Sequence, residues 1–169
     1  MTVVRGSPNP RHLKLAARMR KARKAAGLTR KAVVQLAGGG ETAARDIEMG
    51  NRLPTIGMIA RLAAALSVSA SWLAYGIGEQ PSQGTADCSG MGARLLAVRT
   101  EQSHTKASLA RLAELNPGSI AGIESGGQAG IDTVERLAKE LRISPAWLAY
   151  GVGPRELPGR RRSVRSTSA

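Results

Sequence analysis

The sequence predicts an all-α protein built from two tandem units of five helices each, and two kinds of observation support this. Apolar residues recur at helical spacing between capping residues and glycines. The letters Trp-Leu-Ala-Tyr-Gly at residues 72–76 return at residues 147–151, an offset of 75. Upstream, residues 47–50 (Ile-Glu-Met-Gly) return as residues 123–126 (Ile-Glu-Ser-Gly), an offset of 76. Matches held in register over this length indicate a tandem duplication with one residue gained or lost after the third helix.

Capping and stop residues set the expected helix boundaries of the first unit. Asn9-Pro10 combines a cap with the proline of a first helical position, and Gly27 is a stop signal. Thr29, Thr55 and Ser69 are each expected to accept a hydrogen bond from an amide two or three residues on. The expected helices cover, in order, residues 10–26, 30–37, 41–48, 56–66 and 70–76.

The core of the first unit is expected on the apolar stripes of these helices. The residues expected to point inward are Val33, Leu36, Ala44, Ile47, Ile56, Ile59, Leu62, Leu66, Trp72 and Leu73.

The second unit repeats the scheme with helices over residues 91–101, 106–113, 117–124 and 132–141, and a fifth that opens at Ser144-Pro145. The polar residues 79–90, with Pro and Gly, are typical of a linker. Residues 154–169 are rich in Ser and Arg and are expected to form a basic, disordered tail. The expected domains are therefore residues 1–78 and 91–153, on either side of that linker.

The net charge of +13 is distributed unevenly. Residues 1–78 carry 13 Lys and Arg against 3 Asp and Glu, whereas residues 79–153 carry 7 against 8. Residues 154–169 carry 5 against 1. A basic excess in one segment is typical of a module that binds a polyanion.

Several classes of protein are not expected. The sequence has no 18-residue apolar run for a membrane span and no secretory signal. Its single cysteine, Cys88, fits a reducing cytoplasm, and a cytoplasmic, nucleoid-associated location is expected. No Ser/His/Asp set, paired carboxylates, phosphate loop or metal cluster is present, so an enzyme is not expected. Nor is a cofactor, a metal or a small-molecule ligand.

Residues 28–48 predict two short helices joined by a tight turn at Gly38-Gly39-Gly40, because glycine adopts the positive φ that a sharp reversal needs. The outward face of the second helix is polar. A short polar-faced helix held across another is the helix-turn-helix arrangement that enters a DNA major groove. Ordinary packing of a helical hairpin is the alternative for this stretch alone.

The full five-helix pattern resembles the lambda-repressor/Cro-like (XRE-type) helix-turn-helix family. The resemblance covers roughly residues 10–78 and 90–153. In the first unit it rests on Met19, Arg23, Gly27-Leu28-Thr29, the turn Gly38-Gly39-Gly40, Ile47-Glu48, Gly50, Pro54-Thr55, Leu62-Ala63, Leu66-Ser67-Val68-Ser69 and Trp72-Leu73.

The resemblance implies that the outward residues of the third helix lie in the major groove. Glu41, Thr42 and Arg45 would then face base edges, with Ala43 and Asp46 as neighbours. Arg45 can donate two parallel hydrogen bonds to guanine, Thr42 can bond a base or touch a thymine methyl, and Glu41 can accept from cytosine. The open alternative for Glu41 and Asp46 is that they only solvate this face or pair with Arg45.

The resemblance also implies that the start of the second helix lies against the phosphate backbone. Thr29, Arg30 and Lys31 would meet phosphates there, helped by the positive helix N-terminus. Arg52, in the loop after the third helix, is another candidate for a phosphate contact. Two or three of the cations on the first helix are also expected to approach phosphates. Arg18 has a structural alternative, because Arg94 repeats it in the neutral unit.

The second unit departs from the family pattern on its expected reading face. The outward positions of its third helix are Pro117, Gly118, Ser119, Ala121 and Gly122, and none has a side chain long enough to reach a base pair. We therefore expect this unit to serve self-association or partner binding. The alternative is that its small residues allow close backbone approach and recognition of DNA shape.

Together these features predict a bacterial, repressor-like transcriptional regulator that binds specific sequences of double-stranded DNA. Either both units of one chain dock as a pseudo-dimer, or the first units of two chains pair in a homodimer, and the uneven charge favours two chains. The alternative from another class is a protein-interaction module, such as an antitoxin or adaptor, that uses the same fold.

Overall fold

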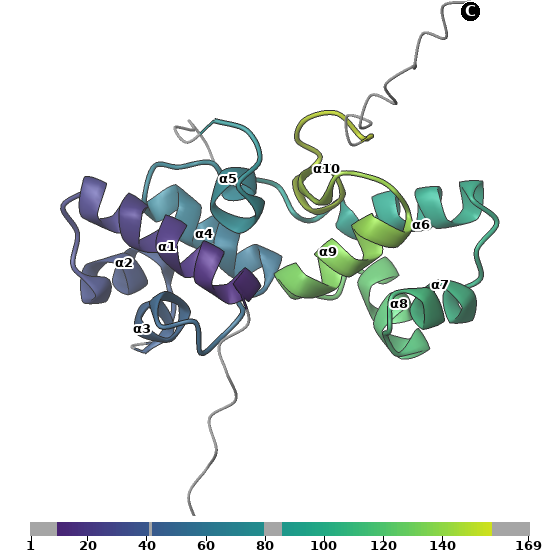
Figure 1. Ribbon diagram of the computed structural model, residues 1–169, viewed down its shortest axis with the longest axis horizontal. Helices are drawn as coiled ribbons and strands as arrows, with labels where there is room; N and C mark the ends of the chain where they lie inside the picture. The colour runs from purple at the N-terminus through teal and green to yellow at the C-terminus, as the bar shows by residue number, and fades with distance from the viewer. Residues whose placement is uncertain (1–9, 41, 80–85, 157–169) are drawn as a thin grey trace, which may run out of the picture.

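The computed structural model describes residues 10–40, 42–79 and 86–156, and over these residues every regular element is a helix (Figure 1). The first unit holds α1 (Pro10–Ala25), α2 (Arg30–Ala37), α3 (Ala43–Glu48), α4 (Ile56–Ala65) and α5 (Ala70–Tyr75). The second holds α6 (Met91–Glu101), α7 (Lys106–Leu112), α8 (Pro117–Glu124), α9 (Ile131–Glu140) and α10 (Pro145–Tyr150). The predicted all-α fold in two tandem units is confirmed.

Several helices begin where the capping residues predict, whereas α3 begins at Ala43 and not at residue 41. The hydroxyl of Thr29 accepts from the amide of Ala32 at 3.1 Å, and that of Thr55 accepts from Met58 at 3.3 Å. Each of these bonds satisfies an amide that has no partner within its own helix. Side-chain caps of the same kind start other helices at Ser69, Thr105, Asn116 and Ser144.

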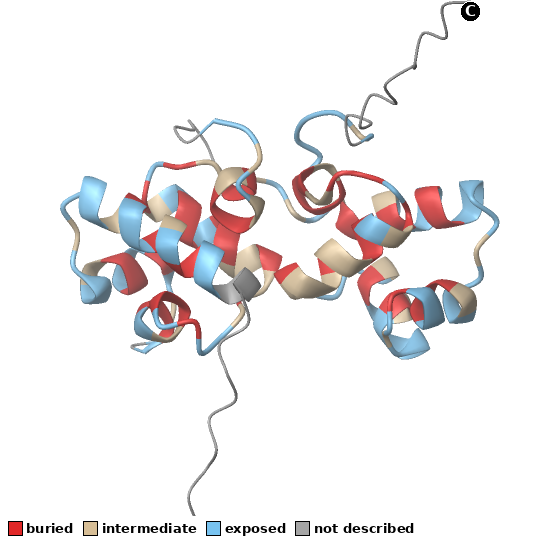
Figure 2. Ribbon diagram, in the orientation of Figure 1, coloured by how far each residue is buried: buried red, intermediate tan, exposed pale blue. Residues whose placement is uncertain are grey.

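The core lies between the helices of each unit, and Figure 2 shows the buried residues on their inner faces. The stripe predicted on α4 is buried, from Ile56 to Leu66. The prediction that Leu36 points inward from α2 is wrong, because this residue is 65% exposed. Since α2 packs against both α3 and α4, it turns Val34 and Ala37 inward together with Val33, which was predicted to be buried.

Arg18 has the structural role that its repetition suggested. Its Nε donates to the carbonyl of Leu73 at 2.8 Å, and a terminal nitrogen donates to that of Ala74 at 2.6 Å. Arg94 makes the same pair of bonds to residues 148 and 149, at 2.9 and 2.8 Å. Both arginines thus tie the first helix of a unit to the carbonyls at the end of its fifth, which lack partners within that helix.

The two units are in contact. Helix α5 packs on α10, and the buried apolar residues of both units form one continuous cluster. Among the helices of the described ranges, none has the length and apolar character needed to cross a bilayer.

Candidate nucleic-acid interface

The turn between α2 and α3 fixes the angle at which α3 leaves the core. Gly38 has φ 62°, a left-handed conformation that favours glycine. The amide of Gly39 then donates to the carbonyl of Val34 at 3.0 Å. After the turn, α3 buries Ala44 and Ile47 fully, so its orientation is determined by packing.

The outward face of α3 carries Thr42 and Arg45, which are exposed, and Asp46, which is half-buried. The side chain of Arg45 makes no hydrogen bond or ion pair with any residue in the described ranges. Glu41 lies outside the described residues. Ala43 does not share this face, because it is buried against the core and so cannot neighbour the bases.

A buried carboxylate holds the end of α3. Glu48 is 1% exposed, and its side-chain oxygens pair with Nε of Arg23 at 2.5 Å and Nε of Arg30 at 2.7 Å. Arg20 donates to the Glu48 carbonyl at 2.9 Å. Burial alone would raise the pKa of Glu48, but the hydrogen bonds and positive charges of Arg23 and Arg30 outweigh it and lower this pKa below its ordinary value. The third helix is thereby fixed to both the first and the second.

The second unit repeats this arrangement. Nε of Arg99 lies 2.6 Å from Oε1 of Glu124, and Nζ of Lys106 lies 3.5 Å from its other oxygen. The sequence reasoning missed this three-residue cluster. The signal was present, because Arg23 and Glu48 recur 76 residues later as Arg99 and Glu124.

The residues proposed for phosphate contact lie at the N-terminus of α2. Lys31 is exposed, whereas Arg30 combines its ion pair with a side chain that is still 47% exposed. Thr29 is exposed and its hydroxyl is the helix cap. The partial positive charge of a helix N-terminus at this place favours an anion.

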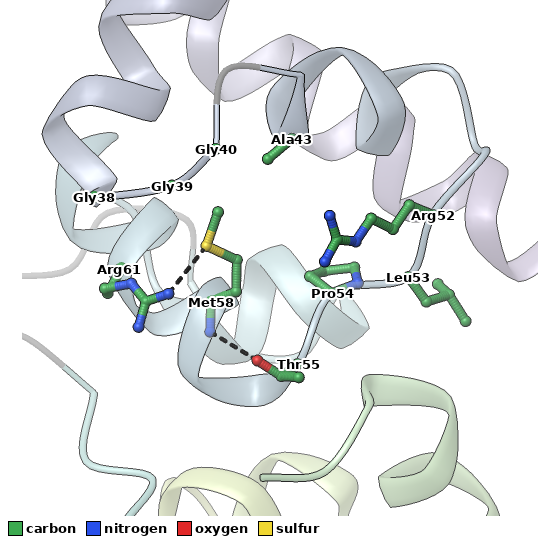
Figure 3. Close-up of a pocket in the computed structure, with 10 residues that line it drawn as sticks. All are labelled: Gly38, Gly39, Gly40, Ala43, Arg52, Leu53, Pro54, Thr55, Met58 and Arg61. Carbon is green, nitrogen blue, oxygen red and sulfur yellow. Dashed lines mark hydrogen bonds between the residues drawn. The ribbon is translucent and has the colours of Figure 1, made fainter.

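A shallow groove lies beside α3, between the glycine turn and the start of α4 (Figure 3). On one side Arg61 is held in place, since its Nε donates to the Ala37 carbonyl at 3.0 Å and a terminal nitrogen to the Met58 sulfur at 3.4 Å. On the other side Arg52 extends over Pro54 and makes no hydrogen bond or ion pair within the described part of the chain. Arg52 therefore keeps all its guanidinium donors for an external anion.

Comparisons with known proteins match each of the two units separately. A family model described as a helix-turn-helix domain matches residues 14–74, and a second one, described as helix-turn-helix, matches residues 95–148. No curated protein matches the chain.

Two solved structures resemble parts of the chain. An HTH_3 family transcriptional regulator from Vibrio cholerae is 29% identical, with a TM-score of 0.36 over 39% of this chain and 37% of that one. A hypothetical transcription factor, NHTF, from Neisseria is 23% identical, with a TM-score of 0.37 over 43% of this chain and 84% of that one. The chain thus spans little more than a third of the length of the first of these relatives.

Each family model falls within one five-helix unit. It includes the third helix of that unit and the turn that precedes it. Over residues 14–148 the chain therefore consists of two helix-turn-helix domains of the XRE type in tandem.

Proposed function

We propose that this protein is a sequence-specific DNA-binding transcriptional regulator whose first domain enters the major groove with α3. The observation that supports this most directly is the state of Arg45. It is exposed on a helix that Glu48 and the core hold firmly, and its side chain has no partner among the described residues. An exposed guanidinium on a helix that is held in this way can donate two parallel hydrogen bonds to guanine. Thr42 and Glu41 are the other residues proposed to contact bases.

Charge supports the assignment of this role to the first domain. Residues 1–78 have a net charge of +10, from 13 basic and 3 acidic residues, whereas residues 79–153 have a net charge of −1. Phosphate contacts are proposed for Thr29, Arg30, Lys31 and Arg52, which border α3 at the start of α2 and in the loop after α3. Contacts of this kind fix the register of a protein on a duplex without selecting its sequence.

The second domain is proposed to serve association and not base reading, and its packing against the first domain supports this. We further propose that the protein acts as a repressor, by occupying an operator and excluding other proteins from it. Occupancy alone suffices for this action and needs no signal-binding domain.

Selection from randomised duplexes, followed by binding titrations, tests the proposal. Arg45→Ala is expected to weaken binding to the preferred duplex by about 1–3 kcal/mol and to leave binding to random duplex nearly unchanged. Lys24→Ala is the matched control, because it removes one exposed positive charge from α1 and none from α3. An Arg45→Ala variant that keeps the parent's ratio of affinities for preferred and random duplex would overturn the proposal.

A further inference from the structure

The boundary between the two domains is made of reciprocal contacts. The amide of Ile56 donates to the carbonyl of Ala129 at 2.9 Å, and the amide of Ile131 donates to that of Pro54 at 3.2 Å. Ile131 is the repeat of Ile56, and Ala129 is the repeat of Pro54, each at an offset of 75. An interface in which equivalent residues of the two sides make equivalent contacts is called isologous. Two subunits related by a two-fold axis form an interface of this kind. Here the two sides belong to one chain.

This boundary is well packed. Ile56 is 2% exposed and Ile131 is 5% exposed, and the hydroxyl of Tyr150 donates to the Ile56 carbonyl at 3.2 Å. The side chain of Gln128 packs against Gly57, because a Cβ added to Gly57 would lie 2.6 Å from Oε1 of Gln128. Each domain thus covers the apolar surface that the other presents at this boundary.

The pseudo-two-fold arrangement brings the two third helices to the same side of the molecule. Figure 1 shows α3 and α8 along one long side, with α5 and α10 on the opposite side. A duplex that lies along that side would therefore face both helices. Paired helix-turn-helix units on DNA contact half-sites about one helical turn apart, at roughly 34 Å.

The two helices carry different side chains at equivalent places. Arg45 corresponds to Ala121 at the offset of 76, and Thr42 corresponds to Gly118. Gly122 faces open space, since a Cβ added there would find no atom within 4 Å outside its own helix backbone and chain neighbours. The outward face of α8 is therefore accessible, but it has no side chain long enough to donate a hydrogen bond to a base edge or to accept one from it.

We propose that a single chain engages a duplex alone, with α3 reading one half-site and α8 lying over the adjoining helical turn without selecting bases. The preferred DNA would then be a non-palindromic site, in contrast to the inverted repeat that a symmetric pair of reading helices selects. This inference rests on the proposed function and specifies the class of DNA that it acts on.

Stoichiometry and selection test the inference on the full-length protein. Sedimentation equilibrium is expected to give the mass of one chain in free solution and one chain for each bound duplex. Selection from randomised duplexes is expected to return one block of conserved positions without an inverted copy. Two chains on each duplex, or an inverted repeat, would overturn the inference while leaving the proposed function intact. Failure to bind any duplex would instead overturn the proposed function.

A variant that gives α8 a side chain able to contact bases tests whether α8 lies over the duplex. Ala121→Arg places on α8 the residue that Arg45 places on α3, and Ala97→Arg adds the same charge to an exposed position of α6 as the matched control. Ala121→Arg is expected to create a second conserved block about 10 base pairs away and to favour duplexes that carry it by roughly 5- to 150-fold. If both variants select the same single block as the parent, α8 does not lie over the duplex and the inference fails.

Discussion

The hydroxyl of Tyr150 donates a hydrogen bond to the carbonyl oxygen of Ile56 at 3.2 Å, across the boundary between the two domains. Its repeat in the first domain, Tyr75, has a buried hydroxyl with no hydrogen-bond partner among the described residues. The pseudo-two-fold symmetry of the boundary therefore breaks at this pair. The Tyr150 hydroxyl is hydrogen-bonded to the opposite domain. The Tyr75 hydroxyl is buried away from water without a hydrogen bond to any described residue that would compensate.

The two tyrosines predict opposite results for the same substitution. Tyr150→Phe is expected to lower the free energy of unfolding by about 1 kcal/mol, because it removes a hydrogen bond made in the folded state. Tyr75→Phe is expected to leave that free energy unchanged or to raise it, because it removes an unsatisfied buried group. Urea denaturation of both variants measures the difference. Equal losses in the two variants would mean that Tyr75 has a partner in solution.

Alkaline titration tests the burial of the same two side chains. Burial raises the pKa of both hydroxyls, and for Tyr75 the proximity of Tyr150, Glu135 and Asp132 raises it further. A raised pKa stabilises the fold fully below the ordinary value of about 10, and this stabilisation falls as the pH rises above it. The tyrosinate absorbance, which these two residues alone supply, is therefore expected to appear together with unfolding. Its appearance above pH 10 in a protein that remains folded would contradict the burial.

The lowered pKa of Glu48 predicts how the free energy of unfolding falls at acidic pH. Its pKa is lowered in the folded state, so its contribution is present above the ordinary value of about 4.5 and is lost as the pH falls through the folded value. Glu48→Gln is expected to cost about 3 kcal/mol at neutral pH, because Arg23 and Arg30 lose their counter-charge. It should also flatten the fall in stability below pH 4.5. Glu114→Gln, at an exposed residue, is the control and should behave like the parent.

Arg52 and Arg18 separate phosphate binding from folding. Arg52→Ala is expected to weaken binding to all duplexes alike and to lower the dependence of log K on log salt by about one unit. Arg18→Ala removes the same charge, but its two bonds to the end of α5 predict a loss of 1–3 kcal/mol in unfolding free energy. Its salt dependence should match the parent's. Binding isotherms at several salt concentrations and urea curves, measured for both variants, distinguish the two roles.

The helices could be predicted from the sequence because their ends depend on local chemistry. Thr29 and Thr55 cap helices in the structure, and Gly38 adopts the left-handed turn conformation. Leu36 shows where this local reasoning fails. Helical spacing allows two sets of inward residues on α2, one with residues 33 and 36 and one with residues 33, 34 and 37. Only the packing of α2 against α3 and α4 selects the second set.

The roles of the arginines depended on information that a charge count does not contain. Arg18 and Arg23 contribute to the basic charge of the first domain, yet both bond within the protein. Their repetition as Arg94 and Arg99 in a domain without excess positive charge was the signal for a structural role. The hydrogen bonds across the boundary between the domains had no such signal, because backbone groups of residues 54–56 and 129–131 make them.

The most direct test of the central claim is site-directed cleavage of DNA from a probe attached to α3. Met49 is exposed at the end of this helix, so Met49→Cys in a Cys88→Ser background gives a single attachment point for an iron chelate. With the preferred duplex bound, strand cleavage is expected within the conserved block, and it should move with the block when the block is shifted along the duplex. Cleavage that ignores the position of the block, or none on a bound duplex, would contradict the assignment of α3 as the reading helix.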